Sequence, residues 1–169
     1  LESSNPRTFG DLDAAQTVLQ TAFMSVMARS GGFATVDYAT LDGSSLLVTD
    51  MLMFVGGGSA STAGGIKVTT LAILFLAAFA EARGADEMEA YERRIPSDVL
   101  RLAVSVVLWG ATLVATSTVL LMLLTDDPLD FVLFDAISAF ATCGLSTGFT
   151  AGANEPAQYV LAATMFLGR

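Results

Sequence analysis

The sequence contains no histidine and only one cysteine, Cys143. Zinc and similar metals are held by His and Cys, and a disulfide needs two cysteines, so neither kind of site can be built from this chain. Catalytic sets such as Ser-His-Asp and Cys-His are excluded for the same reason. We therefore expect the chain not to be an enzyme, and we expect Cys143 to be a small packed residue without a redox role.

Charged residues are also few, and most of them are acidic. They make up 15% of the 169 residues, whereas 53% are hydrophobic and the mean hydropathy is +0.63. Soluble domains have about 25% charged residues, so residence in a membrane explains both departures. The net charge of −9 argues against nucleic acid as a partner, because phosphate binding needs a basic face.

Glycine and small polar residues occupy positions 56–65, between apolar runs at 46–55 and 66–80. Each run is too short to cross a bilayer, which takes roughly 20 residues as a helix. Together they predict one broken helix from 46 to about 82. Irregular backbone at membrane depth occurs only where it lines a wet cavity or is buried in protein, and broken helices mark ion and substrate paths. The break therefore indicates a transport protein.

Residues 102–124 form an almost unbroken apolar run and predict a membrane-spanning helix. Three other apolar segments, 12–28, 130–141 and 158–167, predict shorter helices. The chain also lacks an initiator Met and the basic start of a signal peptide. We therefore expect an internal piece of a longer multi-pass membrane protein.

The positive charges are concentrated in one connection. Five of the eight Lys and Arg residues lie between positions 67 and 101, and the positive-inside rule assigns the connection at 83–97 to the cytoplasm. The opposite side then carries a set of acidic residues, which raises the local concentration of cations. These acidic residues are Asp11, Asp13, Asp37, Asp42, Asp126, Asp127 and Asp130.

Two motifs repeat at one constant spacing. Residues 30–35 align without gaps with 142–147, and 53–56 align with 165–168, in both cases 112 positions later. Each unit predicts a half-length helix, a glycine turn that returns to the outside and a helix that descends inward, which is a pore loop. The carboxyl end of such a helix favours a cation, and the carbonyls of the turn can replace an ion's water. The alternative is that Gly32 and Gly144 only terminate helices, the commonest use of such a glycine.

At these positions the sequence resembles the Trk/Ktr/HKT superfamily of potassium transporters, most nearly the membrane subunits of bacterial Trk and Ktr systems. Residues 29–38 look like its third filter sequence and 138–148 like its fourth, while 53–70 resemble its MFIGGxxGSTAGGIKxT segment. The run Arg93-Arg94-Ile95-Pro96 is similar to its cytoplasmic connection. Four residues beside the carbonyls depart from the usual sequence, which leaves the degree of potassium over sodium selectivity open: Ser30, Gly31, Ala34 and Cys143.

The resemblance implies an all-α membrane protein of helix–pore-loop–helix repeats, like a potassium channel, with four repeats around one pore. Residues 1–82 would be the third repeat, 83–97 the cytoplasmic connection and 98–169 the fourth repeat. The implied function is potassium uptake across the cell membrane, with the potassium ion as substrate and no cofactor in this chain. The implied partners are membrane lipid, a second copy in a homodimer, and a cytosolic ring of nucleotide-binding regulatory subunits.

The same resemblance assigns functional residues. Carbonyls of two turns would bind K⁺ as a selectivity filter, and an intramembrane loop just below would act as a gate. Lys67 would either contact the gate or simply place its charge toward the cytoplasm. Arg169 would be a positive barrier near the loop. The filter residues are Ser30, Gly31, Gly32, Phe33, Thr142, Cys143, Gly144 and Leu145. The gating residues are Gly56, Gly57, Gly58, Ser59, Ser61, Thr62, Gly64, Gly65, Lys67 and Arg169.

Two other functions are compatible with parts of the sequence, and a third is excluded. Residues 58–70 look superficially like a phosphate-binding loop, but Ile66 and Val68 interrupt the Gly-Lys-Ser/Thr succession that such a loop needs, which excludes a nucleotide-binding enzyme. A sodium- or proton-coupled secondary transporter predicts substrate contacts at the helix break. A structural membrane subunit without a path predicts that replacing Gly32 or Gly144 alters only assembly.

Overall fold

The computed structural model describes residues 2, 5, 8–10, 12–58, 63–83, 89–90, 93–94 and 97–169. Helices make up nearly all of its regular structure, as the sequence predicts. The exception is a pair of two-residue antiparallel strands. The elements are α1 (Ala14–Met27), η1 (Tyr38–Thr40), α2 (Gly43–Phe54), α3 (Val68–Ala82), β1 (Glu89–Ala90), β2 (Arg93–Arg94), α4 (Ser97–Leu124), α5 (Leu129–Phe140), α6 (Phe149–Gly152) and α7 (Glu155–Leu167).

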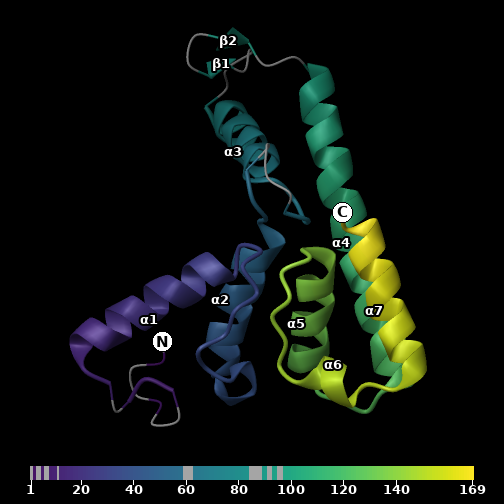
Figure 1. The fold of residues 1–169 in the computed structure, drawn as a ribbon. Helices are drawn as coiled ribbons and strands as arrows, with labels where there is room; N and C mark the ends of the chain where they lie inside the picture. Colours follow the sequence, from purple (N-terminus) through teal and green to yellow (C-terminus); the bar gives the residue numbers. More distant parts are fainter. Residues whose placement is uncertain are drawn as a thin grey trace.

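Helix α4 is the one helix in the described segments that is both long and apolar enough to cross a membrane. The candidate span, Asp98–Leu124, has 27 residues, and its most apolar 18-residue stretch has a mean hydropathy of 2.1. Helices α2 and α3 are apolar but short, and residues 55–67 between them are not helical. The predicted break in this helix is therefore present, and in Figure 1 α3 lies beyond α2 with the irregular segment between them.

Helix α5 lies at the centre of the packing, against α2, α4 and α7 (Figure 1). Phe134 of α5 belongs to an apolar cluster with Leu46 and Met53 of α2. On the other side of α5, Val132 packs in a second cluster with Leu121 of α4. Helix α1 has no buried residue and extends away from the other helices. The fold thus surrounds the short helix α5 with other helices and leaves the short helix α1 on the outside.

A helix, a short helical element of about one turn and a second helix follow one another twice in the chain, as α1–η1–α2 and as α5–α6–α7. Helices α2 and α7 begin at Gly43 and Glu155, which are 112 positions apart. Their N-cap residues, Asp42 and Asn154, have the same spacing. The sequence spacing therefore recurs in the helix boundaries.

Two short elements were not predicted. The segments between the two glycine turns and the helices that follow them read as loops in the sequence, yet η1 and α6 form there. In η1, the backbone N–H of Ala39 donates to Asp37 Oδ1 at 3.0 Å. In α6, the N–H and the hydroxyl of Thr150 both donate to Asp135 Oδ2, at 3.1 and 2.8 Å. Both elements depend on a carboxylate, which apolar periodicity does not detect.

Candidate functional site: two glycine turns and the break in the second helix

We call residues 30–33 the first glycine turn and residues 142–145 the second glycine turn. In the first, Ser30 and Gly32 have φ values of 70° and 71°. In the second, Thr142 and Gly144 have φ values of 50° and 91°. Left-handed backbone is uncommon for a residue with a side chain, so its presence at Ser30 and Thr142 is a specific feature. In both turns the first and third residues have positive φ, and the residue between them does not.

The two turns touch each other. A Cβ atom added to Gly32 would lie 2.5 Å from the carbonyl oxygen of Cys143, and one added to Gly144 would lie 3.7 Å from Gly32 Cα. The Cys143 thiol is buried and donates to the carbonyl oxygens of Ala28 at 3.3 Å and Met27 at 3.5 Å. Cys143 is therefore a packed residue, as expected, and it also connects the second turn to the end of α1.

Each turn directly follows the carboxyl end of a short helix. After α1, the N–H groups of Gly31 and Gly32 donate to the carbonyl of Met27 at 3.0 and 3.2 Å. After α5, the N–H of Cys143 donates to the carbonyl of Ser138 at 2.9 Å. Because a helix carries partial negative charge at its carboxyl end, both turns lie where a cation is favoured.

The turns differ in how deeply they are buried. In the second turn, Leu145 is 3% exposed and Cys143 is 5% exposed. In the first turn, Phe33 is 71% exposed, and Gly31 is also on the surface. The second turn belongs to the packed centre of the molecule, whereas the first lies at its edge with α1.

The break between α2 and α3 is the base of a closed loop. The N–H of Gly56 donates to the carbonyl of Ile66 at 2.8 Å, and the N–H of Ile66 donates to the carbonyl of Phe54 at 3.3 Å. Val55 and Ile66 form a parallel bridge. These bonds hold the end of α2 beside the residues that lead into α3, and we call residues 63–66 the returning end of the loop. The predicted gating residues Ser59, Ser61 and Thr62 lie outside the described residues.

The returning end of this loop contacts the second glycine turn. The N–H of Gly64 donates to Thr142 Oγ1 at 3.1 Å. A Cβ atom added to Gly64 would lie 2.7 Å from that oxygen and 3.0 Å from the carbonyl oxygen of Ala141. The structure therefore brings the glycine-serine loop directly against one of the two turns, and only glycine fits at the contact.

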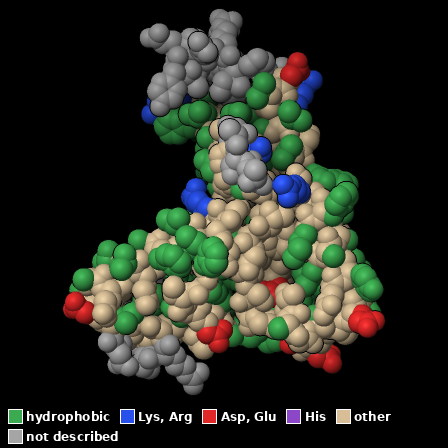
Figure 2. All heavy atoms as spheres, in the orientation of Figure 1, with side chains coloured by type: hydrophobic (Ala, Val, Ile, Leu, Met, Phe, Trp, Pro, Cys, Tyr) green, Lys and Arg blue, Asp and Glu red, His purple; other side chains and the backbone are tan. Residues whose placement is uncertain are grey.

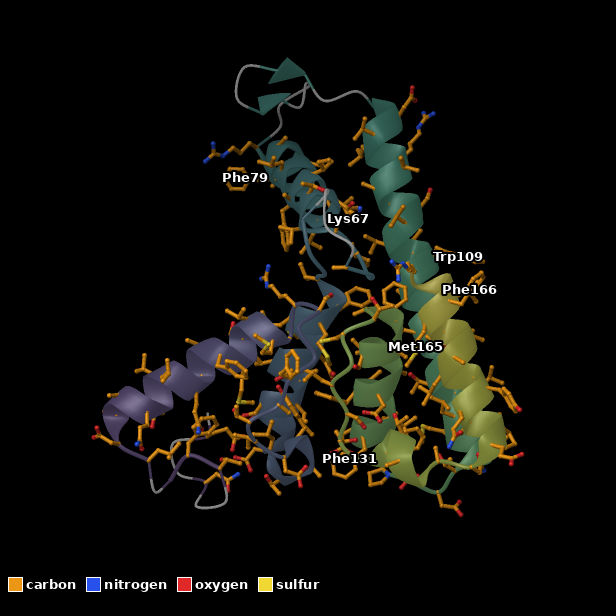
Figure 3. All side chains as sticks on the ribbon, in the orientation of Figure 1. Lys67, Phe79, Trp109, Phe131, Met165 and Phe166 are labelled. Atoms are coloured by element: carbon orange, nitrogen blue, oxygen red, sulfur yellow. The ribbon has the colours of Figure 1, made fainter. Side chains whose placement is uncertain are left out.

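The two predicted gating cations lie near the end of the loop that leads into α3. The N–H of Gly65 donates to the carbonyl of Gly168 at 3.2 Å, which places Arg169 beside the end of the loop. Arg169 and Gly65 line an open cavity of about 350 Å³ together with Trp109 of α4. Lys67 directly precedes α3, on the loop side of that helix, and β1–β2 lie at its other end (Figure 3).

Asp135, in the middle of α5, is a site residue that the sequence analysis missed. Its side chain is 2% exposed. It accepts hydrogen bonds from Ser146 Oγ at 2.8 Å, from the N–H of Thr147 at 3.0 Å, and from the two donors of Thr150. The available signal was a charged residue inside an apolar segment too short to span a membrane, which is by default a functional candidate.

Comparison with known proteins decides the family. The family described as TrkH, cation transport protein, matches residues 2–169. The chain belongs to this family. It is 36% identical over all of its 169 residues to the Ktr system potassium uptake protein B of Vibrio alginolyticus, covering 37% of that protein. It is 32% identical over its whole length to the protein of the same name in Bacillus subtilis, covering 38% of it.

A third relative has a broader description. The chain is 32% identical over 158 residues to the potassium/sodium uptake protein NtpJ of Enterococcus hirae, covering 91% of this chain and 35% of the relative. The chain thus spans little more than a third of the length of these relatives. Membership of the TrkH family confirms the resemblance seen in the sequence and the expectation that the chain is not an enzyme.

The surface of this TrkH-family chain is sided in charge. Figure 2 shows acidic side chains mainly at the end where α6 lies and where α2 begins. Lys and Arg lie nearer the middle and toward the end where α4 begins, where acidic side chains are also visible. Trp109 and Phe166 project outward from α4 and α7 (Figure 3), and both are largely exposed. Exposed aromatic side chains of this kind suit contact with lipid or with further membrane helices.

Proposed function

We propose that this chain is part of a potassium uptake protein of the cell membrane, and that its two glycine turns line one cation path. The observation that supports this most strongly is the contact between two turns of matching backbone conformation. In the first turn the N–H groups of Gly31 and Gly32 both point at the carbonyl of Met27, and in a trans peptide the preceding carbonyl points the opposite way, so the carbonyls of Ser30 and Gly31 are directed away from the helix end. Carbonyl oxygens on a common side can replace the water around a dehydrated potassium ion. These two turns consist of the residues that the sequence predicts as the selectivity filter.

The helices before the turns strengthen the preference for a cation. Helix α1 ends at Met27 and α5 at Phe140, each within three residues of a glycine turn. About half a negative charge is associated with each carboxyl end. Within the described residues, no three His, Cys, Asp or Glu side chains gather as a metal-ligand set. Main-chain oxygens and helix ends are therefore the groups that would bind the ion.

We propose that the loop between α2 and α3 is the gate. Its returning end bonds to Thr142, so its position and the shape of the second turn depend on each other. Arg169, beside Gly65, would add a positive charge that raises the barrier to a cation when the loop is in place. Lys67, two residues after Gly65 and directly before α3, is a second candidate for such a charge.

Potassium is the proposed substrate, because two of the three relatives above are described as potassium uptake proteins. The third is described as a potassium/sodium uptake protein, so sodium is the competing ion to test. By the same family resemblance, residues 1–82 and 98–169 form the third and fourth of four repeats, with 83–97 in the cytoplasm. The homodimer and the cytosolic regulatory ring remain predictions that these residues do not test.

The test uses the complete transporter that carries this sequence, purified and reconstituted in liposomes. We expect uptake of K⁺ to exceed uptake of Na⁺. Gly32→Ser and Gly144→Ser should reduce that ratio. Gly43→Ser is the matched control, because a Cβ atom there meets nothing within 4 Å. An unchanged ratio in both turn variants, at normal protein levels, would refute the filter assignment.

The same preparation separates the alternative, an ion-coupled secondary transporter with its site at the helix break. Deleting residues 58–63 keeps the bridge between Val55 and Ile66 but removes the loop. If the loop is a gate, the deletion raises basal K⁺ flux and leaves the K⁺/Na⁺ ratio unchanged. If the break is the binding site, the deletion abolishes uptake instead. Gly43→Ala is the control, since a Cβ atom there meets nothing within 4 Å and Gly43 belongs to neither the gate nor the turns.

A further inference from the structure

Asp135 is connected to the chain that leaves the second glycine turn. Its Oδ2 accepts from Ser146 Oγ and from both donors of Thr150, and its Oδ1 accepts from the N–H of Thr147. Ser146 Oγ in turn accepts from the N–H of Gly148 at 3.0 Å. One buried carboxylate thus fixes residues 146–150, which begin directly after Leu145.

These bonds cross from one element to another. Asp135 lies on α5, before the turn, and its donors lie in the segment after the turn and in α6. The side chain therefore links the helix that precedes the turn to the segment that follows it. All four partners are donors, and a carboxylate can accept from all of them without leaving a polar group unpaired.

The equivalent positions at the first glycine turn carry other residues. The residues 112 positions before Asp135, Ser146 and Thr150 are Phe23, Ala34 and Tyr38. Phe23 has no atom that can accept a hydrogen bond, and Ala34 has no side-chain donor. Among the described residues, a buried carboxylate that links the preceding helix to the outgoing segment is therefore found at the second turn and not at the equivalent position of the first.

We propose that Asp135 is a positioning residue that holds the second glycine turn in its ion-selective shape. This inference rests on the proposed function, because it assumes that the turn discriminates between ions. Asp135 acts through Ser146, Thr147 and Thr150 and does not itself contact the ion. If these bonds are lost, residues 146–150 after the turn are free to move. The turn then accepts the smaller, more strongly hydrated Na⁺ more readily.

Asp135→Asn in the complete transporter is the first test. The amide has the same shape, but its NH₂ group faces donors and leaves at least one of them unpaired. We expect the ratio of K⁺ to Na⁺ uptake in liposomes to fall about tenfold, the effect of losing one or two charged hydrogen bonds. Asp98→Asn is the matched control, because it makes the same exchange at an exposed side chain of α4 that belongs neither to the acidic set nor to the turns.

A purely structural role would lower the amount of folded protein and the maximal uptake rate, without altering the ratio of the two ions. The second test avoids the buried substitution. Thr150→Val removes one donor to Asp135, and Ser146→Ala removes another. Each should lower the K⁺/Na⁺ ratio by a smaller factor. Combined with Asp135→Asn, each should add much less than it does alone, because the partners act through one network.

The outcomes separate the two proposals. If the unmodified transporter does not prefer K⁺, the proposed function is wrong. If it prefers K⁺ but Asp135→Asn keeps the full ratio at normal protein levels, the positioning role is wrong and the proposed function stands. Should Asp135→Asn fail to fold, Thr150→Val and Ser146→Ala decide, and an unchanged ratio in both overturns the inference.

Discussion

The first and second glycine turns have the same alternation of φ, yet their surroundings differ. Thr142 contacts the loop between α2 and α3, Cys143 bonds to the end of α1, and Asp135 supports the outgoing chain. The first turn follows α1, which has no buried residue. A repeated backbone can therefore be supported unequally, because the side chains around it need not repeat. Variants at equivalent positions measure how unequal the two turns are.

The largest difference is expected between Gly32→Ala and Gly144→Ala. Both glycines have positive φ, where a side chain costs about 1–2 kcal/mol. At Gly32 the added Cβ would also lie 2.5 Å from the Cys143 carbonyl oxygen, whereas at Gly144 it has room. Unfolding of the purified transporter in detergent should show a loss several-fold larger for Gly32→Ala. An equal or larger loss for Gly144→Ala would contradict the contact between the turns.

Thr142 and its counterpart Ser30 differ in their contact with the loop. Thr142→Val removes the oxygen that accepts from Gly64 N–H, and a typical hydrogen bond of about 1 kcal/mol corresponds to roughly fivefold. Basal K⁺ flux through liposomes should rise by about that factor. Thr142→Ser keeps the acceptor and should restore the low flux. If Ser30→Ala raises the flux as much as Thr142→Val, the loop does not act on the second turn specifically.

Cys143 provides a smaller test, because a thiol is a weak donor. Cys143→Ala removes the bonds to the carbonyls of Ala28 and Met27, whereas Cys143→Ser keeps a donor in the same place. We expect Cys143→Ser to retain about 0.5–1 kcal/mol more stability than Cys143→Ala. Chemical unfolding in detergent measures the difference. Equal stability of the two variants would show that packing alone holds the turn against α1.

The smallest effect is expected where the helices after the turns differ. Ser117 of α4 and Thr164 of α7 pair through their hydroxyls at 2.7 Å, whereas the residue of α2 that corresponds to Thr164 is Leu52. A double-mutant cycle of Ser117→Ala and Thr164→Val should give a coupling of about 0.6 kcal/mol, the average for such bonds in membranes. A coupling of zero would mean that apolar packing alone fixes α7 on α4.

Composition and spacing predicted much of this arrangement. The break between α2 and α3 was predicted because glycine and serine stand out in an apolar stretch. The turns at Gly32 and Gly144 were predicted because two motifs repeat at one spacing. Helix α7 begins at Glu155, three residues before the expected start, because Asn154 caps it through a hydrogen bond to Ala157 N–H that apolar periodicity does not detect. Such differences at helix ends follow from local capping.

The contacts between distant residues could not be predicted. The bond from Gly64 to Thr142 joins positions 78 apart, and the thiol contact of Cys143 joins positions more than 100 apart. Neither contact can be predicted from local composition, because tertiary packing decides which side chains meet. Asp135 is an intermediate case. Its place inside an apolar helix marks it as unusual, but only the fold shows that its partners are in the segment after the turn.

The central claim is that main-chain oxygens of both turns bind one column of dehydrated cations. Anomalous diffraction from crystals of the complete transporter grown in thallium, a heavy substitute for potassium, tests it most directly. We predict anomalous peaks between residues 30–33 and residues 142–145, within coordination distance of their carbonyl oxygens. Peaks found only at the break between α2 and α3, with none at the turns, would contradict the claim.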